Sequence, residues 1–207
     1  MPKPLKFHHE NSRAAVLLSP QAYRKTVALV SEFSDEVAWH GSVTRSSDNE
    51  FTIEDIFVYP QEVTSGTVNT DQVEYANWLH SQDDELFNKL RMQGHSHVNM
   101  SVSPSGVDEQ HRKQILAQLE SDMFYIFMIW NKSLDFHTTI YDVSQNVLYE
   151  DKDIDVKLIH DEGMDEFLAD VRTKVRKQVV RKPQKSKPHA ACIQHDYYDL
   201  GGEYFPC

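Results

Sequence analysis

Short apolar runs alternate with longer amphipathic segments along most of this chain, and this alternation constrains its fold more than any other feature. The longest apolar run, 123–130, has the length of a strand and is far shorter than the roughly 20 apolar residues that a membrane span needs. Runs of this length favour β-strands, whereas the periodic apolar positions between them favour helices. We therefore predict an α/β domain of the α+β type, with a mixed central β-sheet flanked by helices.

The expected elements follow from periodicity and from capping residues. Strands are predicted over 14–18, 37–43, 51–59, 91–97, 123–130, 135–141 and 147–150, and helices over 20–33, 71–90, 105–120 and 161–180. Ser19 and Pro20 supply the N-cap and the first residue of the first helix. The second helix is expected to break near 81–83, and 60–70 to form a loop. Within the third helix, Val107 is expected to be available for burial.

The length of 207 residues suits one domain with appendages. We place the main domain at 12–160, a C-terminal helix at 161–182 and a flexible tail at 183–207. The chain has two cysteines, both in the tail, and its first twelve residues lack an apolar signal core. These features predict a cytoplasmic protein that neither relies on a disulfide framework nor enters a membrane.

Charge is distributed unevenly. Residues 1–170 carry a net charge of −16 and residues 171–189 a net charge of +8. An acidic body repels nucleic acid and tolerates basic protein partners, so no nucleic-acid partner is expected. The basic stretch is short and lacks interleaved aromatic residues, which favours packing against an acidic surface. The sequence leaves the oligomeric state open.

One stretch carries a pattern of potential metal ligands: Gly94-His95-Ser96-His97, followed after seven residues by Ser105-Gly106-Val107-Asp108. Residues two apart on a strand point to the same side, so His95 and His97 can converge on one point. Asp108 follows Ser105 by about one helical turn and shares its face. Two imidazoles and one carboxylate form a three-ligand zinc site that keeps a fourth position open, as catalytic zinc sites do.

The spacing of His95, His97, Ser105 and Asp108 resembles the motif of the JAMM (MPN+, or JAB-domain) zinc metalloproteases. Its details look more like the bacterial and phage members than the eukaryotic deubiquitinases. The family also has a glutamate on an early strand, and Glu36 stands at the matching place. The resemblance covers residues 12–150. It implies the three-layer MPN/JAB architecture, which is similar to that of cytidine deaminases, and it makes 12–160 the catalytic domain.

The resemblance implies a role for each residue of the motif. His95, His97 and Asp108 would hold one catalytic Zn²⁺ ion, Glu36 would take and return the proton, and Ser105 would donate to the developing oxyanion. The implied reaction is hydrolysis of an amide bond after the Gly-Gly terminus of a ubiquitin-like protein. Either an isopeptide bond of a conjugate or a linear bond of a precursor could be cleaved.

The sequence departs from the family around the motif. Val98 stands where the family often has Pro, and Trp39 and His40 stand where small residues are common. His40 is expected on the strand surface and His111 on the solvated face of its helix, although either could serve the site. Two other functions stay open: a non-catalytic scaffold with the same fold, and a phage-type peptidase that acts on structural or cell-wall peptides.

Overall fold

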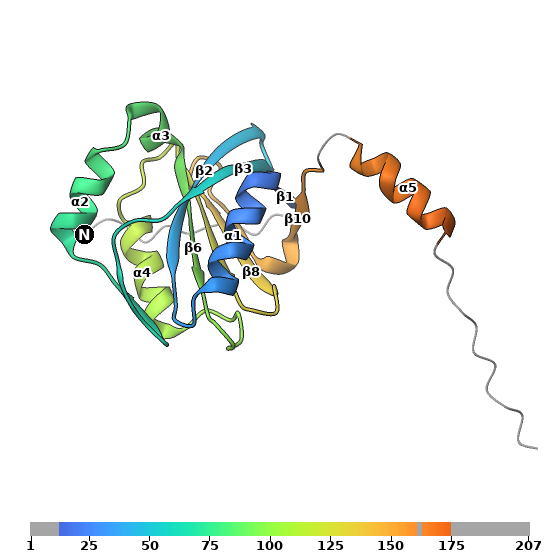
Figure 1. Cartoon of the computed structure of the whole chain (residues 1–207). Helices are drawn as coiled ribbons and strands as arrows, with labels where there is room; N and C mark the ends of the chain where they lie inside the picture. The colour runs from blue at the N-terminus through green and yellow to red at the C-terminus, as the bar shows by residue number, and fades with distance from the viewer. Residues whose placement is uncertain (1–12, 161–162, 175–207) are drawn as a thin grey trace, which may run out of the picture. The chain divides into compact units, whose positions relative to one another are not determined.

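The computed structural model describes residues 13–160 and 163–174 and shows a large mixed β-sheet flanked by helices (Figure 1), as predicted. The strands in chain order are β1 (Ala14–Leu18), β2 (Ala38–Ser47), β3 (Glu50–Phe57), β4 (Glu62–Thr64), β5 (Thr67–Asn69), β6 (Leu90–Ser96), β7 (Phe124–Trp130), β8 (Phe136–Asp142), β9 (Val147–Tyr149) and β10 (Ile154–Leu158). The eight-stranded sheet has the order β10-β1-β3-β2-β6-β7-β8-β9, and β4 pairs with β5 separately. β1 runs parallel to β3 and β10, and β6 runs parallel to β7; the other neighbours are antiparallel.

The helices begin at polar caps. They are α1 (Pro20–Glu32), α2 (Gln72–His80), α3 (Asp84–Lys89), α4 (Gly106–Leu116) and α5 (Met164–Lys174), with a short 3-10 helix at Asp151–Asp153. Ser19, Asp71, Asp83 and Ser105 each accept a hydrogen bond from a backbone N–H of the helix that follows. Each cap satisfies a donor that the first helical turn cannot pair internally, so the sequence fixes where these four helices start.

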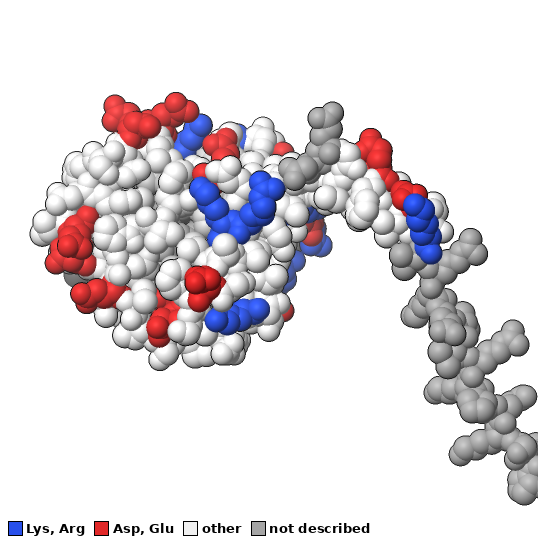
Figure 2. All heavy atoms as spheres, viewed as in Figure 1, with Lys and Arg blue, Asp and Glu red and all other residues white. Residues whose placement is uncertain are grey.

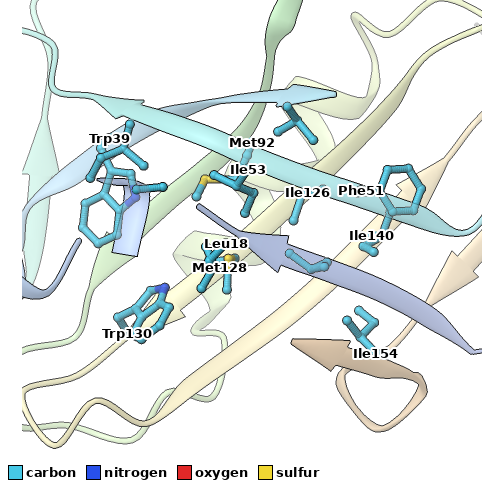
Figure 3. Close-up of a cluster of buried hydrophobic side chains, with 14 of the residues drawn as sticks. Leu18, Trp39, Phe51, Ile53, Met92, Ile126, Met128, Trp130, Ile140 and Ile154 are labelled. Atoms are coloured by element: carbon cyan, nitrogen blue, oxygen red, sulfur yellow. The ribbon is translucent and has the colours of Figure 1, made fainter. Parts of the chain in front are cut away.

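The main hydrophobic core lies between α1 and one face of the sheet. Figure 3 shows its central side chains, among them Trp39, Ile126, Met128 and Trp130, which are almost fully buried. The even-numbered residues of β7 join this core because side chains alternate across a strand. The odd-numbered Phe127 faces the other layer, where the Arg112 guanidinium of α4 lies 5.3 Å from its ring centroid. Helices therefore cover both faces of the sheet.

The central position of β6 sets up the functional site. It lies between β2, which is antiparallel to it, and β7, which is parallel. Antiparallel pairing brings the last residues of one strand beside the first residues of its neighbour. Ala38 near the start of β2 accordingly pairs with His95 near the end of β6. The carboxyl end of β6 thus meets the segment that leads into β2.

Two elements differ from the prediction. The predicted loop over 60–70 contains the hairpin β4–β5, which turns at Ser65-Gly66. Ser-Gly between two β-prone triplets is a turn signal that a loop assignment overlooks. The edge strand β10 was not predicted, although its apolar and charged residues alternate. The break expected near 81–83 is confirmed, because α2 and α3 are separate helices.

Helix α4 ends at Leu116, earlier than the predicted 120, and Val107 is 71% exposed rather than buried. The helix turns Asp108 and Arg112 toward the sheet, and Val107 consequently faces away from it. Asp108 and Arg112, rather than Val107, therefore make the contacts of this part of α4.

Helix α5 runs across the boundary between the main unit of the chain and a second unit that begins at Phe167. Of the predicted helix over 161–182, Met164–Lys174 is helical and Gly163 lies in a turn; residues 161–162 and 175–182 and the predicted tail at 183–207 lie outside the described residues. Phe167 is exposed, and Leu168 is half-buried. Among the described helices, none is both long and apolar enough to cross a membrane.

Candidate metal centre

The carboxyl end of β6 presents two imidazoles. His95 lies within the strand and His97 follows its last residue, so both side chains emerge on the same side. The backbone N–H of His97 donates to the carbonyl of Trp130 at 2.7 Å, which extends the contact with β7 past the end of the strand. The predicted convergence is confirmed: the two Nε2 atoms lie 3.1 Å apart.

Helix α4 brings the carboxylate to the imidazoles. Asp108 Oδ1 lies 3.1 Å from His95 Nε2, and Asp108 Oδ2 lies 3.4 Å from His97 Nε2. The potential ligand atoms of these three residues all lie within 4.8 Å of one another, and His95, His97 and Asp108 could together hold a metal ion. Within the described ranges, this is the one group of three or more such residues that meets that criterion.

The N-terminus of α4 fixes Asp108 through a capping box. The Ser105 hydroxyl oxygen accepts from the Asp108 N–H at 3.2 Å, and the Ser105 N–H donates to Asp108 Oδ2 at 2.6 Å. Both bonds lock the first turn of the helix and orient the carboxylate. Ser105 therefore lies beside the potential metal ligands, and its role as N-cap uses an oxygen lone pair and leaves its hydroxyl proton available as a donor.

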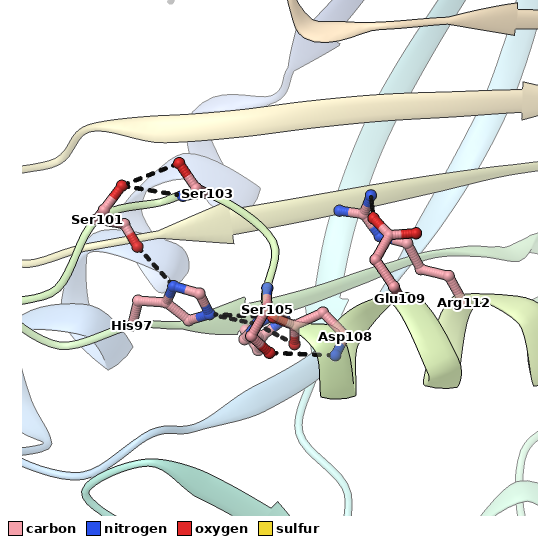
Figure 4. A network of polar contacts seen from close by, with 8 residues as sticks. His97, Ser101, Ser103, Ser105, Asp108, Glu109 and Arg112 are labelled. Carbon is pink, nitrogen blue, oxygen red and sulfur yellow. Dashed lines mark hydrogen bonds and ion pairs between the residues drawn. The ribbon is translucent and has the colours of Figure 1, made fainter.

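A backbone carbonyl orients His97. The ring Nδ1 lies 2.6 Å from the carbonyl oxygen of Ser101, as Figure 4 shows together with the contact to Asp108. A carbonyl can only accept, so Nδ1 carries the proton and Nε2 is left to face Asp108 and His95. Histidines that ligate metals commonly have their second nitrogen fixed in this way.

The ligand set is arranged for a charged carboxylate. Burial alone would raise the pKa of the Asp108 carboxyl, but hydrogen bonds from His95, His97 and Ser105 together outweigh burial and hold that pKa far below its usual range. The hydrogen bond with Asp108 likewise raises the pKa of His97, against the opposing effect of burial. These groups attract one another strongly when no cation lies between them.

Glu36 lies near His95, His97 and Asp108, in the segment just before β2, and is 7% exposed. The adjoining Val37 is tied to β6, because its N–H donates to the Ser96 hydroxyl at 3.0 Å and its carbonyl accepts from the Ser96 N–H at 2.9 Å. Burial raises the pKa of the Glu36 carboxyl, while the charges of His97 and His95 lower it. The structure therefore brings the glutamate singled out from the sequence close to the three potential ligands.

Next to this site lies an aromatic cluster that the sequence did not predict. His40 is 4% exposed instead of lying on the surface; its Nε2 lies 2.7 Å from the Tyr75 hydroxyl, and its ring stacks on Trp78 of α2. Burial lowers the pKa of His40 to about 4. His40 is buried because β2 is a central strand and α2 covers this face, a long-range arrangement that local sequence does not encode.

His111 lies on α4, one turn beyond Asp108. Burial lowers its pKa, and the nearby charge of His95 lowers it further. Its side chain nonetheless keeps substantial solvent exposure, as predicted, and it is not one of the three grouped potential ligands.

Exposed acids occupy part of the molecular surface. Figure 2 shows acidic side chains near the top of the view, where Figure 1 places α3, and Asp83, Asp84 and Glu85 at the start of that helix are exposed.

Comparison with known proteins gives no assignment for this chain. No model of a protein family matches the sequence, and no curated protein matches it either.

Proposed function

We propose that this chain is a zinc-dependent amide hydrolase of the JAMM type, in which His95, His97 and Asp108 hold the metal. The observation that carries the proposal is the convergence of these side chains within 4.8 Å of one another beside the buried carboxyl of Glu36. The motif spacing and the mixed sheet with helices on both faces support an MPN/JAB architecture.

The spacing of the ligand atoms supports zinc. Ligands that bind at about 2.0–2.1 Å in a tetrahedron are separated by about 3.3 Å. The two Nε2 atoms of His95 and His97 lie 3.1 Å apart and Asp108 Oδ1 lies 3.1 Å from His95 Nε2, both close to that edge length, while the other carboxylate oxygen, Oδ2, lies 3.4 Å from His97 Nε2. Two nitrogens and one oxygen are common zinc ligands, and three protein ligands leave one position for a reactant.

Bound zinc would supply Lewis-acid polarisation of a carbonyl and a lowered pKa for water. Glu36 would accept a proton from the attacking water and return it to the leaving amine, which requires a carboxyl whose pKa lies nearer to neutrality than usual. Its burial produces a shift in this direction.

Ser105 would stabilise the charge that develops on the carbonyl oxygen. Its capping bond fixes the oxygen at the start of α4, and its hydroxyl proton can point into the site. The N-terminal end of the helix adds a favourable field for negative charge. One donor of this kind contributes about 3–4 kcal/mol to stabilisation of the transition state.

The substrate class follows from the JAMM resemblance: an isopeptide or linear amide bond after the Gly-Gly terminus of a ubiquitin-like protein, in the cytoplasm. Glycines suit a narrow approach to a metal because their backbone can lie close to it. The exposed acids of α3 favour basic protein partners over nucleic acid. A phage-type peptidase would share the metal site and differ only in substrate, whereas a scaffold would not need Glu36 and the ligands to converge.

The test replaces Glu36 by Gln, which keeps the shape of the side chain and removes the base. The Glu36→Gln variant should bind zinc like the wild type and lose about 10²–10⁴-fold in turnover of a ubiquitin-like fusion that ends in Gly-Gly. Glu32→Gln, an exposed change at the end of α1, serves as the matched control and should keep full turnover. Equal turnover in Glu36→Gln and wild type would remove Glu36 from the mechanism.

A panel of candidate substrates distinguishes the proposed substrate class from the two alternatives. Cleavage of the Gly-Gly fusion favours the modifier protease, cleavage of peptidoglycan fragments favours the phage-type peptidase, and a chain that purifies without zinc and cleaves neither is a scaffold.

A further inference from the structure

Val98, directly after the ligand His97, has a backbone conformation that its side chain disfavours. Its φ angle is +48°, in the left-handed region. Glycine reaches this region freely, and asparagine tolerates it, whereas a β-branched side chain is sterically strained there. Such strain persists only where the surrounding structure imposes it, and it is concentrated at functional sites.

The conformation of Val98 closes a tight turn. The Met100 N–H donates to the His97 carbonyl at 2.8 Å, so the chain reverses over Val98 and the next residue. This reversal carries the carbonyl of Ser101 back to the ring of His97, 2.6 Å from Nδ1 (Figure 4). The hydrogen bond that selects the ring tautomer therefore depends on the turn at Val98.

The neighbouring β7–β8 turn holds this loop in place. The Lys132 N–H donates to the Val98 carbonyl at 2.7 Å, and the Asn131 side-chain amide donates to the Met100 carbonyl at 3.3 Å. Asn131 is itself 8% exposed and accepts from the N–H groups of Ser133 and Asp135 at 3.0 Å each. The loop is thus attached to a second, internally bonded turn, which can impose the strained φ angle.

We propose, on the basis of the metal site proposed above, that Val98 is a positioning residue whose strained turn pre-sets His97 for the metal. The turn presents the Ser101 carbonyl to Nδ1, which keeps the proton there and leaves the Nε2 lone pair directed at the ion. The bonds from Lys132 and Asn131 impose this conformation, and the β-branched side chain restricts the alternatives open to the loop, whereas glycine would allow many.

The experiment compares three variants of the full chain. Val98→Gly removes both the strain and the stiffness, and Val98→Asn removes strain but keeps a side chain that tolerates the left-handed region. Asn146→Gly is the matched control, because Asn146 also has a positive φ angle, +57°, but lies in the β8–β9 turn. For each variant, zinc affinity is measured against a competing chelator, and the ring ¹⁵N shifts of His97 are recorded in the metal-free protein at a pH at which a titration shows the ring to be neutral.

The expected result is weaker zinc binding in Val98→Gly, by no more than the roughly 10–100-fold seen when the partner of a metal-bound histidine is lost outright, because the Ser101 carbonyl is still present but less often in place. His97 should be mainly the Nδ1–H tautomer in the wild type, in Val98→Asn and in Asn146→Gly, and a mixture of tautomers in Val98→Gly. The thermal midpoint of metal-free Val98→Gly should not fall below that of Asn146→Gly, so a general loss of fold does not explain the weaker binding.

Unchanged zinc affinity and an unchanged tautomer in Val98→Gly would overturn this role for Val98 and leave the proposed hydrolase intact. A wild-type chain that binds no zinc would overturn the proposed function instead. The tautomer comparison needs no metal, so the two failures are distinguishable.

Discussion

Gly94 shows how a single position in β6 couples the core to the candidate metal site. A Cβ atom at Gly94 would lie 2.4 Å from Nε1 and Cε2 of Trp39, the buried residue of β2 that pairs with Gly94. Glycine therefore lets the indole lie flat against the strand that carries His95. The packing on one face of β6 and the ligand on its other face depend on the same stretch of backbone.

We expect Gly94→Ala to lower the free energy of unfolding by about 3 kcal/mol, because a rigid indole and two backbones must move apart. Gly41→Ala is the matched change: its Cβ would lie 3.2 Å from the flexible side chain of Met92, and about 1 kcal/mol is expected. Urea unfolding of both variants measures the difference. An equal loss of unfolding free energy in the two variants would contradict the close contact between Gly94 and Trp39.

The buried His40 predicts a pH dependence of stability. Its pKa is about 4 in the folded chain, below the ordinary 6.5, so only the unfolded chain takes up a proton between these values. The contribution of neutral His40 to stability is therefore fully present above about pH 6.5. The free energy of unfolding should fall by up to about 3 kcal/mol as the pH drops to about 4. In His40→Gln this slope should be much reduced, whereas His80→Gln, at the exposed end of α2, should retain it.

At the scale of residues, the potential metal ligands could be picked out because the geometry within each pair is local. His95 and His97 need only a strand, and Ser105 and Asp108 need only one helical turn. Glu36 was found only through the resemblance, because its place beside His95 depends on antiparallel pairing of β2 with β6. The turn at Val98 could not be foreseen, because Val carries no turn signal and its φ angle is imposed from outside the loop.

At the scale of elements, the first turn of helix α4 has two structural roles. Its capping box stabilises the helix and at the same time orients Asp108 toward the two histidines. Loss of the Ser105 hydroxyl should therefore affect both the helix and the site.

Ser105→Ala is expected to cost about 1 kcal/mol of stability through the lost cap and about 10²–10³-fold in turnover through the lost donor. Asp83→Ala removes the comparable cap of α3, where Asp83 accepts from the Leu86 N–H at 2.7 Å. That control should lose similar stability and no turnover. Thermal unfolding and a peptidase assay on both variants separate the roles, and a similar loss of turnover in both would assign Ser105 to structure alone.

Elements with strong local signals were predicted, and those that depend on distant partners were not. The cap at Ser19 and the apolar run of β7 fixed two elements correctly. Strand β10 owes its place to parallel pairing with β1, in which Ala14 faces Ile154 from the other end of the domain. Short edge strands gain their stability from such pairing, which no local window contains.

At the scale of the whole molecule, metal binding should be linked to folding. His95 and His97 come from β6 and Asp108 from α4, so an ion held by all three binds the folded chain and hardly the unfolded one. Free zinc at about 100 times its dissociation constant should stabilise the fold by about 2.7 kcal/mol. Calorimetry with zinc and then with excess chelator measures this gain, and an unfolding midpoint that does not depend on zinc would contradict the linkage.

The proposed metal centre depends on one ion shared by three side chains, and elemental analysis of the purified chain after dialysis against zinc tests it most directly. The wild type should retain about one zinc ion per chain. Asp108→Ala should retain little, whereas Glu109→Ala, changed at the adjacent residue of α4, should retain as much as the wild type. A wild-type chain without zinc, or an Asp108→Ala variant that keeps it, would contradict the proposed metal centre.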